Sequence, residues 1–306
     1  MRIRVLGSAA GGGFPQWNCN CRNCSGLRNG TLRAVARTQS SIAVAGADAA
    51  AWALVNASPD ILAQLRAHRE LQPARAARDT AIAGVVLVDA QIDHTTGLLM
   101  LRESTRPLAI WCTDAAYADL TGGNPIFKVL GHYCGIDRRR VDEAGGEFAV
   151  EGVAGVTWRA LAVASKPAPY SPHRGAPVAG DNVALVIGDR ASGKTAVYAP
   201  GLGALEPAIW SALEAAACVL VDGTFWSDDE MIAQGLSRKR ARDLGHLPQS
   251  GPGGMLEALA RLPRATRKIL IHVNNTNPIL DEDSPERAAL TRAGVEVASD
   301  SMEIAL

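Results

Sequence analysis

The chain has 306 residues, and its 31 Lys and Arg residues balance its 31 Asp and Glu residues, so the formal net charge is zero. This balance argues against a nucleic-acid groove or an anionic membrane surface as the main partner, because both require a local excess of positive charge. Hydrophobic residues make up 47% of the chain and charged residues 20%, a composition that is typical of a globular protein and excludes intrinsic disorder.

The N-terminal part of the chain predicts strands and one helix. A strand is expected at Ile3–Leu6, and this apolar run is too short for a signal peptide. The segments Ser41–Ala45 and Ala51–Asn56 flank a Gly-Ala-Asp turn and predict a β-hairpin. Ser58 is a favourable N-cap and Pro59 a favourable first helical residue, so we expect a helix to begin there.

The remainder of the chain alternates between strands and helices. Residues Ile82–Val88 are almost wholly apolar, as expected of a buried central strand, and Gly97–Arg102 favours a helix. No repeat, low-complexity linker or membrane-length apolar stretch interrupts this pattern. We therefore expect a single cytoplasmic domain over residues 1–306, with two mixed β-layers, helices outside them and no membrane span. The further predicted strands are Leu108–Trp111, Val156–Leu161, Val183–Ile187, Thr195–Tyr198, Cys218–Val221 and Lys268–His272.

The segment Gly188–Thr195 matches the phosphate-loop pattern of nucleotide hydrolases. Such a loop holds phosphate only if a helix begins at its Lys-Thr end, because the backbone N–H groups and the helix dipole bind the anion. Residues Thr195–Gly201 instead favour a short strand followed by a break. We therefore favour a hairpin loop, and nucleotide hydrolysis is only a remote alternative.

The segment Lys166–Gly175 is polar, rich in proline and without clear periodicity. It predicts a long surface loop. Long loops in compact domains often border functional sites.

Three of the six cysteines, Cys19, Cys21 and Cys24, lie within one short segment. Because the chain has no export signal, a disulfide framework is not expected. Three thiols at this spacing favour a structural zinc site, although redox thiols can have a similar spacing. The segment supplies no fourth ligand, which must come from elsewhere in the chain. Candidates for that ligand are Asn275, Asp281 and Asp283.

Several histidines follow predicted strands. Asp93 and His94 come after the apolar strand that begins at Ile82, and His272 ends another strand. Ligands of open α/β sheets bind at the carboxyl ends of strands, so these side chains are candidates for one metal site. A histidine that merely caps a helix or lies on the surface is the better explanation for His68, His132 and His173.

These residues resemble the metallo-β-lactamase superfamily, whose signature is HxHxDH after a strand. A narrower resemblance, to the branch of the superfamily that takes part in the biosynthesis of pyrroloquinoline quinone (PQQ), extends along essentially the whole chain. It implies a four-layer αββα sandwich, a zinc-binding cysteine loop at residues 19–24 and a role in making PQQ from a Glu-Tyr-derived precursor. The segments that carry this resemblance are Phe14–Cys21, Asp222–Trp226, Gly245–Pro248, His272–Pro278 and Asp281–Pro285.

The sequence departs from the superfamily pattern at the first metal position. Asp89 and Gln91 stand where a dinuclear hydrolase carries its first two histidines, and no bridging aspartate is found near Tyr198–Gly201. The first metal position is therefore expected to be lost. The second position keeps Asp93, His94 and His272 as metal ligands. Two histidines and one carboxylate with open positions suit Fe(II) and O₂ chemistry.

From this pattern we predict a mononuclear non-haem iron enzyme. It would use O₂ to hydroxylate the tyrosine ring of a small peptide or amino-acid precursor of PQQ. His246 would act as a fourth ligand or as an acid/base. Asp222 would orient a ligand histidine, while Asp89 and Gln91 would bind substrate in place of the lost metal.

Two alternative functions remain open at this point. One is a zinc-dependent hydrolase, in which Zn²⁺ lowers the pKa of a bound water. The other is a non-catalytic carrier of PQQ or its precursor, handing it on toward the periplasm. The sequence also leaves the oligomeric state open, and a homodimer is one option.

Overall fold

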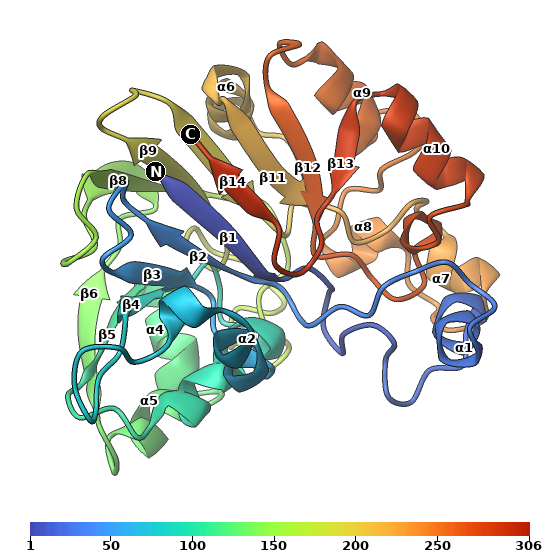
Figure 1. Cartoon of the computed structure of the whole chain (residues 1–306). Helices are drawn as coiled ribbons and strands as arrows, with labels where there is room; N and C mark the ends of the chain where they lie inside the picture. The colour runs from blue at the N-terminus through green and yellow to red at the C-terminus, as the bar shows by residue number, and fades with distance from the viewer.

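The computed structural model of the chain describes residues 1–306 and is built on two seven-stranded β-sheets (Figure 1). The first sheet contains, in spatial order, β14 (Glu303–Ala305), β1 (Arg2–Gly7), β2 (Ser41–Ala45), β3 (Trp52–Val55), β4 (Ile82–Val86), β5 (Leu108–Cys112) and β6 (Ile136–Arg140). The second contains β13 (Val295–Val297), β12 (Arg267–Ile271), β11 (Cys218–Asp222), β10 (Thr195–Ala199), β9 (Val183–Asp189), β8 (Val156–Ala162) and β7 (Ala144–Phe148).

Apolar side chains from both sheets meet in a continuous core between them. Val5 and Val55 from the first sheet and Trp158, Ile187 and Tyr198 from the second belong to one cluster of 27 buried residues. Strands β2, β3, β9 and β11 are buried along their whole length. Strands of this kind need cover on both faces, which explains their nearly uninterrupted apolar sequences.

Helices provide that cover on the outer faces. The α-helices are α1 (Arg22–Asn29), α2 (Ile61–Ala67), α3 (Ile92–Thr95), α4 (Asp114–Thr121), α5 (Ile126–Leu130), α6 (Pro207–Ala215), α7 (Glu230–Ala233), α8 (Ala241–Leu244), α9 (Met255–Arg261) and α10 (Pro285–Arg292). The 3₁₀ helices are η1 (Arg69–Leu71), η2 (Thr96–Leu101) and η3 (Pro278–Leu280). Buried side chains of α2, α4, α5 and η2 pack on the first sheet, and those of α6, α9 and α10 pack on the second. The chain is therefore a four-layer αββα sandwich, as the resemblance implies.

The two ends of the chain lie side by side in the first sheet (Figure 1). Strands β1 and β14 are antiparallel, with Ile3 opposite Ile304. Both isoleucines are buried in the core between the sheets. Every helix in the structure is too short or too polar to cross a membrane.

The segment that resembles a phosphate loop is a hairpin loop. Strands β9 and β10 are antiparallel, with Gly188 opposite Thr195. The chain after Lys194 therefore enters a strand, and no helix begins there to hold a phosphate. The prediction of a hairpin loop is confirmed.

Two predicted helices differ from the structure. Helix α2 begins at Ile61, two residues later than predicted, although the Ser58 hydroxyl accepts the Asp60 N–H at 3.2 Å, which is the contact expected of an N-cap, and donates to Gln64 Oε1 at 3.0 Å. Residues around Gly97 form a 3₁₀ helix, since the Gly97 N–H donates to the Ala57 carbonyl at 2.9 Å, outside its own segment.

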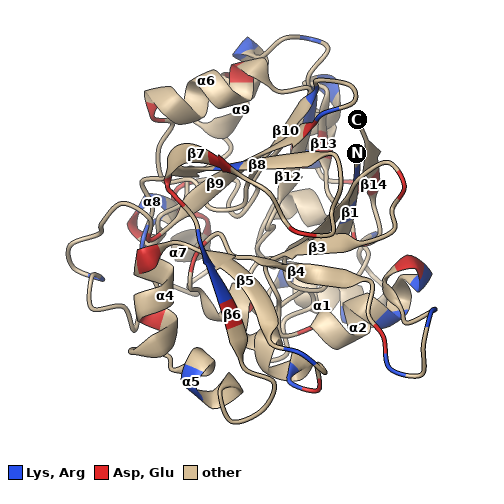
Figure 2. Ribbon diagram, turned by 90° about the vertical axis from the view of Figure 1, so that its left-hand side faces the viewer, with Lys and Arg blue, Asp and Glu red and all other residues tan.

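Strand β6 has a basic sequence that did not predict a strand (Figure 2). Its arginines are neutralised locally. Arg138 and Arg140 both pair with Asp114, the latter at 2.8 Å, and Arg139 pairs with Asp137 at 2.7 Å. Acidic neighbours therefore compensate the positive charge of this strand.

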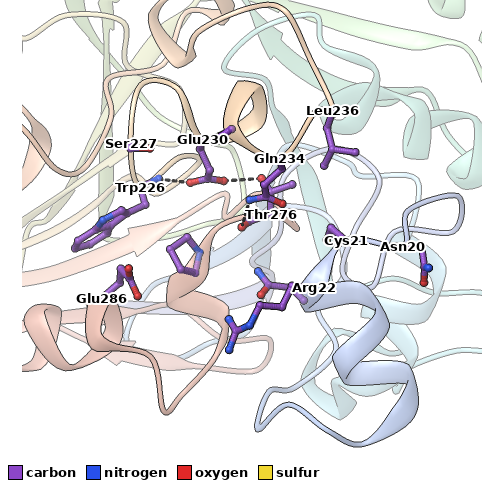
Figure 3. Close-up of a pocket in the computed structure, with 13 residues that line it drawn as sticks. Asn20, Cys21, Arg22, Trp226, Ser227, Glu230, Gln234, Leu236, Thr276 and Glu286 are labelled. Atoms are coloured by element: carbon purple, nitrogen blue, oxygen red, sulfur yellow. Dashed lines mark hydrogen bonds between the residues drawn. The ribbon is translucent and has the colours of Figure 1, made fainter.

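A cavity of about 700 Å³ lies between the cysteine loop and α7 (Figure 3). Glu230 projects into it from α7 and is only 6% exposed. Its carboxylate accepts the Thr276 hydroxyl at 2.5 Å and the Trp226 N–H at 2.6 Å. Burial outweighs these hydrogen bonds and raises the pKa of Glu230 to about 7.

We predict that the stability of the Glu230→Gln variant relative to the wild type increases as the pH rises. The wild-type carboxyl has a pKa of about 7 when folded and near 4.5 when unfolded, so its contribution to stability is complete below 4.5 and is lost as the pH passes 7. The difference in unfolding free energy should shift in favour of the variant by about 2.5 kcal/mol between pH 5 and pH 8. Urea unfolding followed by circular dichroism measures this difference.

Glu286→Gln is the matched control, because Glu286 lines the same cavity but is less buried than Glu230. Its free-energy difference from the wild type, measured in the same way, is the reference for the shift of Glu230→Gln. A constant free-energy difference between Glu230→Gln and the wild type over this range would contradict the prediction.

Candidate metal and active site

The ends of several strands bring the predicted site residues together. Asp93 and His94 lie on α3, which follows β4, and His272 directly follows β12. The φ angle of His272 is 63°, in the left-handed region, which residues other than glycine adopt only where their surroundings hold them. Gly11, in the glycine-rich turn after β1, packs against Asp93, since a Cβ at Gly11 would lie 3.2 Å from Asp93 Oδ2.

The donor atoms of Asp93, His94 and His272 converge. His272 Nε2 lies 3.2 Å from Asp93 Oδ2, and His94 Nε2 lies 3.8 Å from the same oxygen. His94 Nε2 is buried and has no hydrogen-bond partner. A buried nitrogen without a partner is costly unless something else binds it. The three side chains therefore fit a metal cation, and together they form a group of possible metal ligands.

Asp89 fixes the ring of His94. Both Asp89 carboxylate oxygens lie 2.8 Å from His94 Nδ1, and Oδ1 also accepts the Gln91 N–H at 2.8 Å. With Nδ1–H donated to Asp89, the lone pair of Nε2 is directed at the centre of the group. Asp89, predicted to bind substrate, thus has its carboxylate oriented toward His94.

The pKa shifts around this centre show that it favours positive charge. Burial alone lowers the pKa of His94, but Asp89 and Asp93 outweigh it and raise that pKa to about 9. Burial alone raises the pKa of Asp93, but His94 and His272 outweigh it and hold that pKa below its usual range. The centre is thus arranged to hold either a proton or a metal cation.

Thr224 orients His272, a role that we did not assign from the sequence. The Thr224 hydroxyl donates to Asp222 Oδ1 at 2.6 Å, so its lone pair is free to accept His272 Nδ1–H at 2.9 Å. Nε2 of His272 then faces the centre with its lone pair. A threonine two residues after a strand-end aspartate is typical of such a turn and could have been recognised in Asp222-Gly-Thr224.

His246 lies beside His272, as predicted. The two rings stack at 5.7 Å between centroids, and His246 Nδ1 lies 2.7 Å from Asp222 Oδ2. Burial alone lowers the pKa of His246, but Asp222 outweighs it and raises that pKa. Asp222 is fully buried and also accepts the N–H groups of Leu202 and Thr224. These contacts make Asp222 an orienting group for His246.

The metal centre opens into a cavity of about 390 Å³. Gln91 lines this cavity and donates from Nε2 to the Lys166 carbonyl at 3.2 Å. The predicted loop is confirmed as a border of the site, because Lys166, Pro169 and Arg174 form part of the wall. His246 lines the same cavity, within reach of a bound molecule.

The three cysteines of the loop also converge, around Asn275. Asn275 Nδ2 lies 3.1, 3.6 and 3.4 Å from the sulfurs of Cys19, Cys21 and Cys24. The other two candidates for a fourth ligand face elsewhere. Asp281 pairs with Arg22 at 2.6 Å, and Asp283 pairs with Arg33 at 3.3 Å.

Comparisons with known proteins agree with this fold. A profile of the beta-lactamase superfamily domain matches residues 51–273. Coenzyme PQQ synthesis protein B of Azoarcus sp. (strain BH72) is 64% identical over 306 residues, covering 100% of both chains. The protein of the same name from Cupriavidus necator is 61% identical over 304 residues, covering 99% of each chain. The crystal structure of Zn²⁺-bound PqqB from Methylobacterium extorquens has a TM-score of 0.90 and 34% identity, covering 100% of both chains. The chain therefore belongs to the coenzyme PQQ synthesis protein B family of the beta-lactamase superfamily.

Proposed function

We propose that this chain, whose family gives it a role in the synthesis of coenzyme PQQ, is a mononuclear non-haem iron oxygenase of the cytoplasm. Its substrate would be a small peptide or amino-acid precursor, and its reaction the hydroxylation of a tyrosine ring. The observation that carries this proposal is the unpartnered Nε2 of His94, which lies beside Asp93 and His272. Two imidazoles and one carboxylate are the donor set that suits Fe(II) and O₂.

Iron held by these three residues would supply the activation of O₂, so that one oxygen atom enters the ring and the other becomes water with two electrons from a reductant. Asp89 and Thr224 keep the ligand histidines in the correct tautomer. Gln91, on the cavity wall, would contact the substrate.

His246 is proposed to transfer protons at the centre. Its Nδ1 is held by Asp222 at 2.7 Å, so the proton that it can exchange is on Nε2. Asp222 stabilises the protonated ring and favours proton uptake. The acid/base role of His246 is one of the two that the sequence predicts, whereas Asp222, predicted to orient a ligand histidine, is proposed here to orient His246.

A second metal, zinc, is proposed for the cysteine loop. The three thiols surround the Asn275 side chain. A flip of its amide group would place the amide oxygen, in place of Nδ2, as the fourth ligand. Asn23 ties the loop to the same segment by donating to the carbonyls of Asn275 and Asn277 at 3.1 and 2.8 Å. His272 lies only three residues before Asn275, so this zinc would steady a ligand of the iron.

The zinc in the relative from Methylobacterium extorquens favours one competing function, a zinc-dependent hydrolase. The donors around Asp93 could hold Zn²⁺ and lower the pKa of a bound water. The two functions differ in their need for O₂. A zinc enzyme of this kind would act anaerobically, whereas the oxygenase would not.

We predict that protein loaded anaerobically with Fe(II) incorporates one atom of ¹⁸O from ¹⁸O₂ into the ring of L-glutamyl-L-tyrosine when ascorbate is present. Mass spectrometry of the product measures the incorporation. His94→Ala should abolish it, because the variant lacks one of three ligands, while His132→Ala, at an exposed histidine, should leave it unchanged.

Two outcomes would contradict the oxygenase. Turnover of the precursor by zinc-loaded protein without O₂ would support the hydrolase. Binding of the precursor by wild type and His94→Ala alike, with no turnover by either, would support the carrier.

We further predict that Thr224→Val weakens metal binding about 10- to 100-fold, because His272 loses the partner that orients it. Thr224→Ser keeps the hydroxyl and should bind metal like the wild type. Co(II) titration followed by its visible absorption measures both. Equal affinities for the valine variant and the wild type would show that Thr224 does not position His272.

A further inference from the structure

We propose that Lys166, Arg174 and Asn182 form a carboxylate-binding subsite, so that the molecule taken into the cavity is an anion with at least one free carboxylate. This inference rests on the proposed function for the reaction, but it concerns the recognition of the substrate. All three residues line the cavity that contains Asp93 and His94.

Lys166 and Arg174 are cations without an acidic partner. Neither forms an ion pair with any Asp or Glu of the chain, although both are only partly exposed. The Arg174 guanidinium donates from Nη1 to the Pro167 carbonyl, which fixes it within its own loop. The carbonyl of Lys166 is held by Gln91, so the backbone that carries the ammonium group is anchored to the wall of the cavity.

The basic residues of β6 differ from Lys166 and Arg174 because they have acidic partners. Arg138, Arg139 and Arg140 lie together, and each pairs with a neighbouring aspartate. The basic run Arg238–Arg242 forms no ion pair with its side chains, but it lies outside the cavity wall, and Asp243 and Asp228 accept the backbone N–H groups of Arg240 and Arg242. Within the cavity wall, Lys166 and Arg174 are the lysine and arginine side chains, and both are unpaired.

The acidic groups of the cavity do not cancel this charge. Asp89 and Asp93 are the only carboxylates in the wall, and both face histidines of the metal centre. A divalent cation bound there would be balanced by the charges of Asp93 and of Asp89, which contacts His94. Lys166 and Arg174 therefore leave the cavity wall with an excess of positive charge, which favours an anion.

Asn182 supplies an independent observation. It is 7% exposed, and its Nδ2 is buried without a hydrogen-bond partner. An unpartnered buried donor in the wall of a cavity is explained by a ligand that accepts its hydrogen bond. A carboxylate can accept from Asn182 and Lys166 and can form a two-pronged contact with the Arg174 guanidinium.

The size of the cavity sets the size of that anion. Its volume of about 390 Å³ is in the range that small-molecule sites have, and is enough for an amino acid or a dipeptide. A carboxylate held by Lys166 and Arg174 would fix one end of such a molecule. The remainder, including an aromatic ring, would then lie toward Asp93 and His272.

The test compares a charged probe with a neutral one of the same shape. N-acetyl-L-glutamyl-L-tyrosine carries two carboxylates, whereas N-acetyl-L-glutaminyl-L-tyrosinamide carries no charge. Calorimetry on the zinc-loaded full chain without O₂ measures binding alone, so the result does not depend on whether the chain is an oxygenase. We expect the charged probe to bind at least about 10-fold more tightly than the neutral one, as charge-assisted hydrogen bonds imply.

Lys166→Met and Arg174→Met should each weaken the charged probe about 10-fold or more and leave the neutral probe unchanged. Arg174→Lys should lose less, because it keeps the charge. The control is Lys194→Met, at an exposed lysine in the β9–β10 turn, at the other end of β9 from Asn182, and it should change neither affinity.

Three outcomes would overturn the proposal. They are equal affinity of the wild type for the two probes, equal weakening of both probes by the methionine variants, and absence of measurable binding of the charged probe. Thermal unfolding of each variant identifies a general loss of structure, and in that case Arg174→Lys, which preserves the charge, decides between the subsite and a packing role.

Discussion

The structure depends on two histidine rings, each held at Nδ1 so that its Nε2 meets the same carboxylate. Asp89 holds His94, Thr224 holds His272, and Asp93 lies between the two Nε2 atoms. Both orienting contacts use Nδ1, so the two Nε2 atoms remain available to a cation. Donors positioned in this way need little rearrangement of side chains to bind one.

The backbone strain of that arrangement lies at His272, and hydrogen bonds from the surrounding loops hold the strained segment in place. His272 adopts a left-handed backbone conformation, which is unfavourable for a residue with a β-carbon. The segment after it is fixed by Asn277, whose Nδ2 donates to the carbonyls of Gly223 and Thr224, and by Asn23 from the cysteine loop. The cysteine loop is therefore hydrogen-bonded to the segment that follows His272. Its three sulfurs nevertheless form a group of possible metal ligands separate from that of Asp93, His94 and His272.

Much of the fold follows from the sequence because its buried strands are apolar along their whole length. Ile82–Val86 and Cys218–Asp222 could be recognised in this way. The strands that were missed carry no such pattern. β6 is basic and is compensated by Asp114, a residue from another element, and β14 has only three residues, which pair with β1 from the far end of the chain.

The site residues also fall into those that the sequence reveals and those that it does not. Asp93, His94 and His272 follow apolar strands and are chemically conspicuous, whereas Thr224 and Asn182 act through single contacts that only the folded chain creates. The choice among Asn275, Asp281 and Asp283 likewise needed coordinates, because any of these polar residues could have reached the thiols. Arg22 and Arg33 engage the two aspartates, whereas the Asn275 side chain contacts the sulfurs of the cysteine loop.

Asp89, which stands where the superfamily signature has a histidine, links these features to the proposed chemistry. A histidine there would offer a neutral nitrogen to a second cation, but a carboxylate instead accepts the proton of His94 Nδ1. Asp89 thus supports His94, and the proposed single cation would have three protein donors. Three donors would leave coordination positions open for O₂ and substrate, which a closed site such as the zinc site proposed for the cysteine loop would not. These two groups of possible metal ligands therefore differ in their donor chemistry, one with three thiols and the other with two imidazoles and a carboxylate.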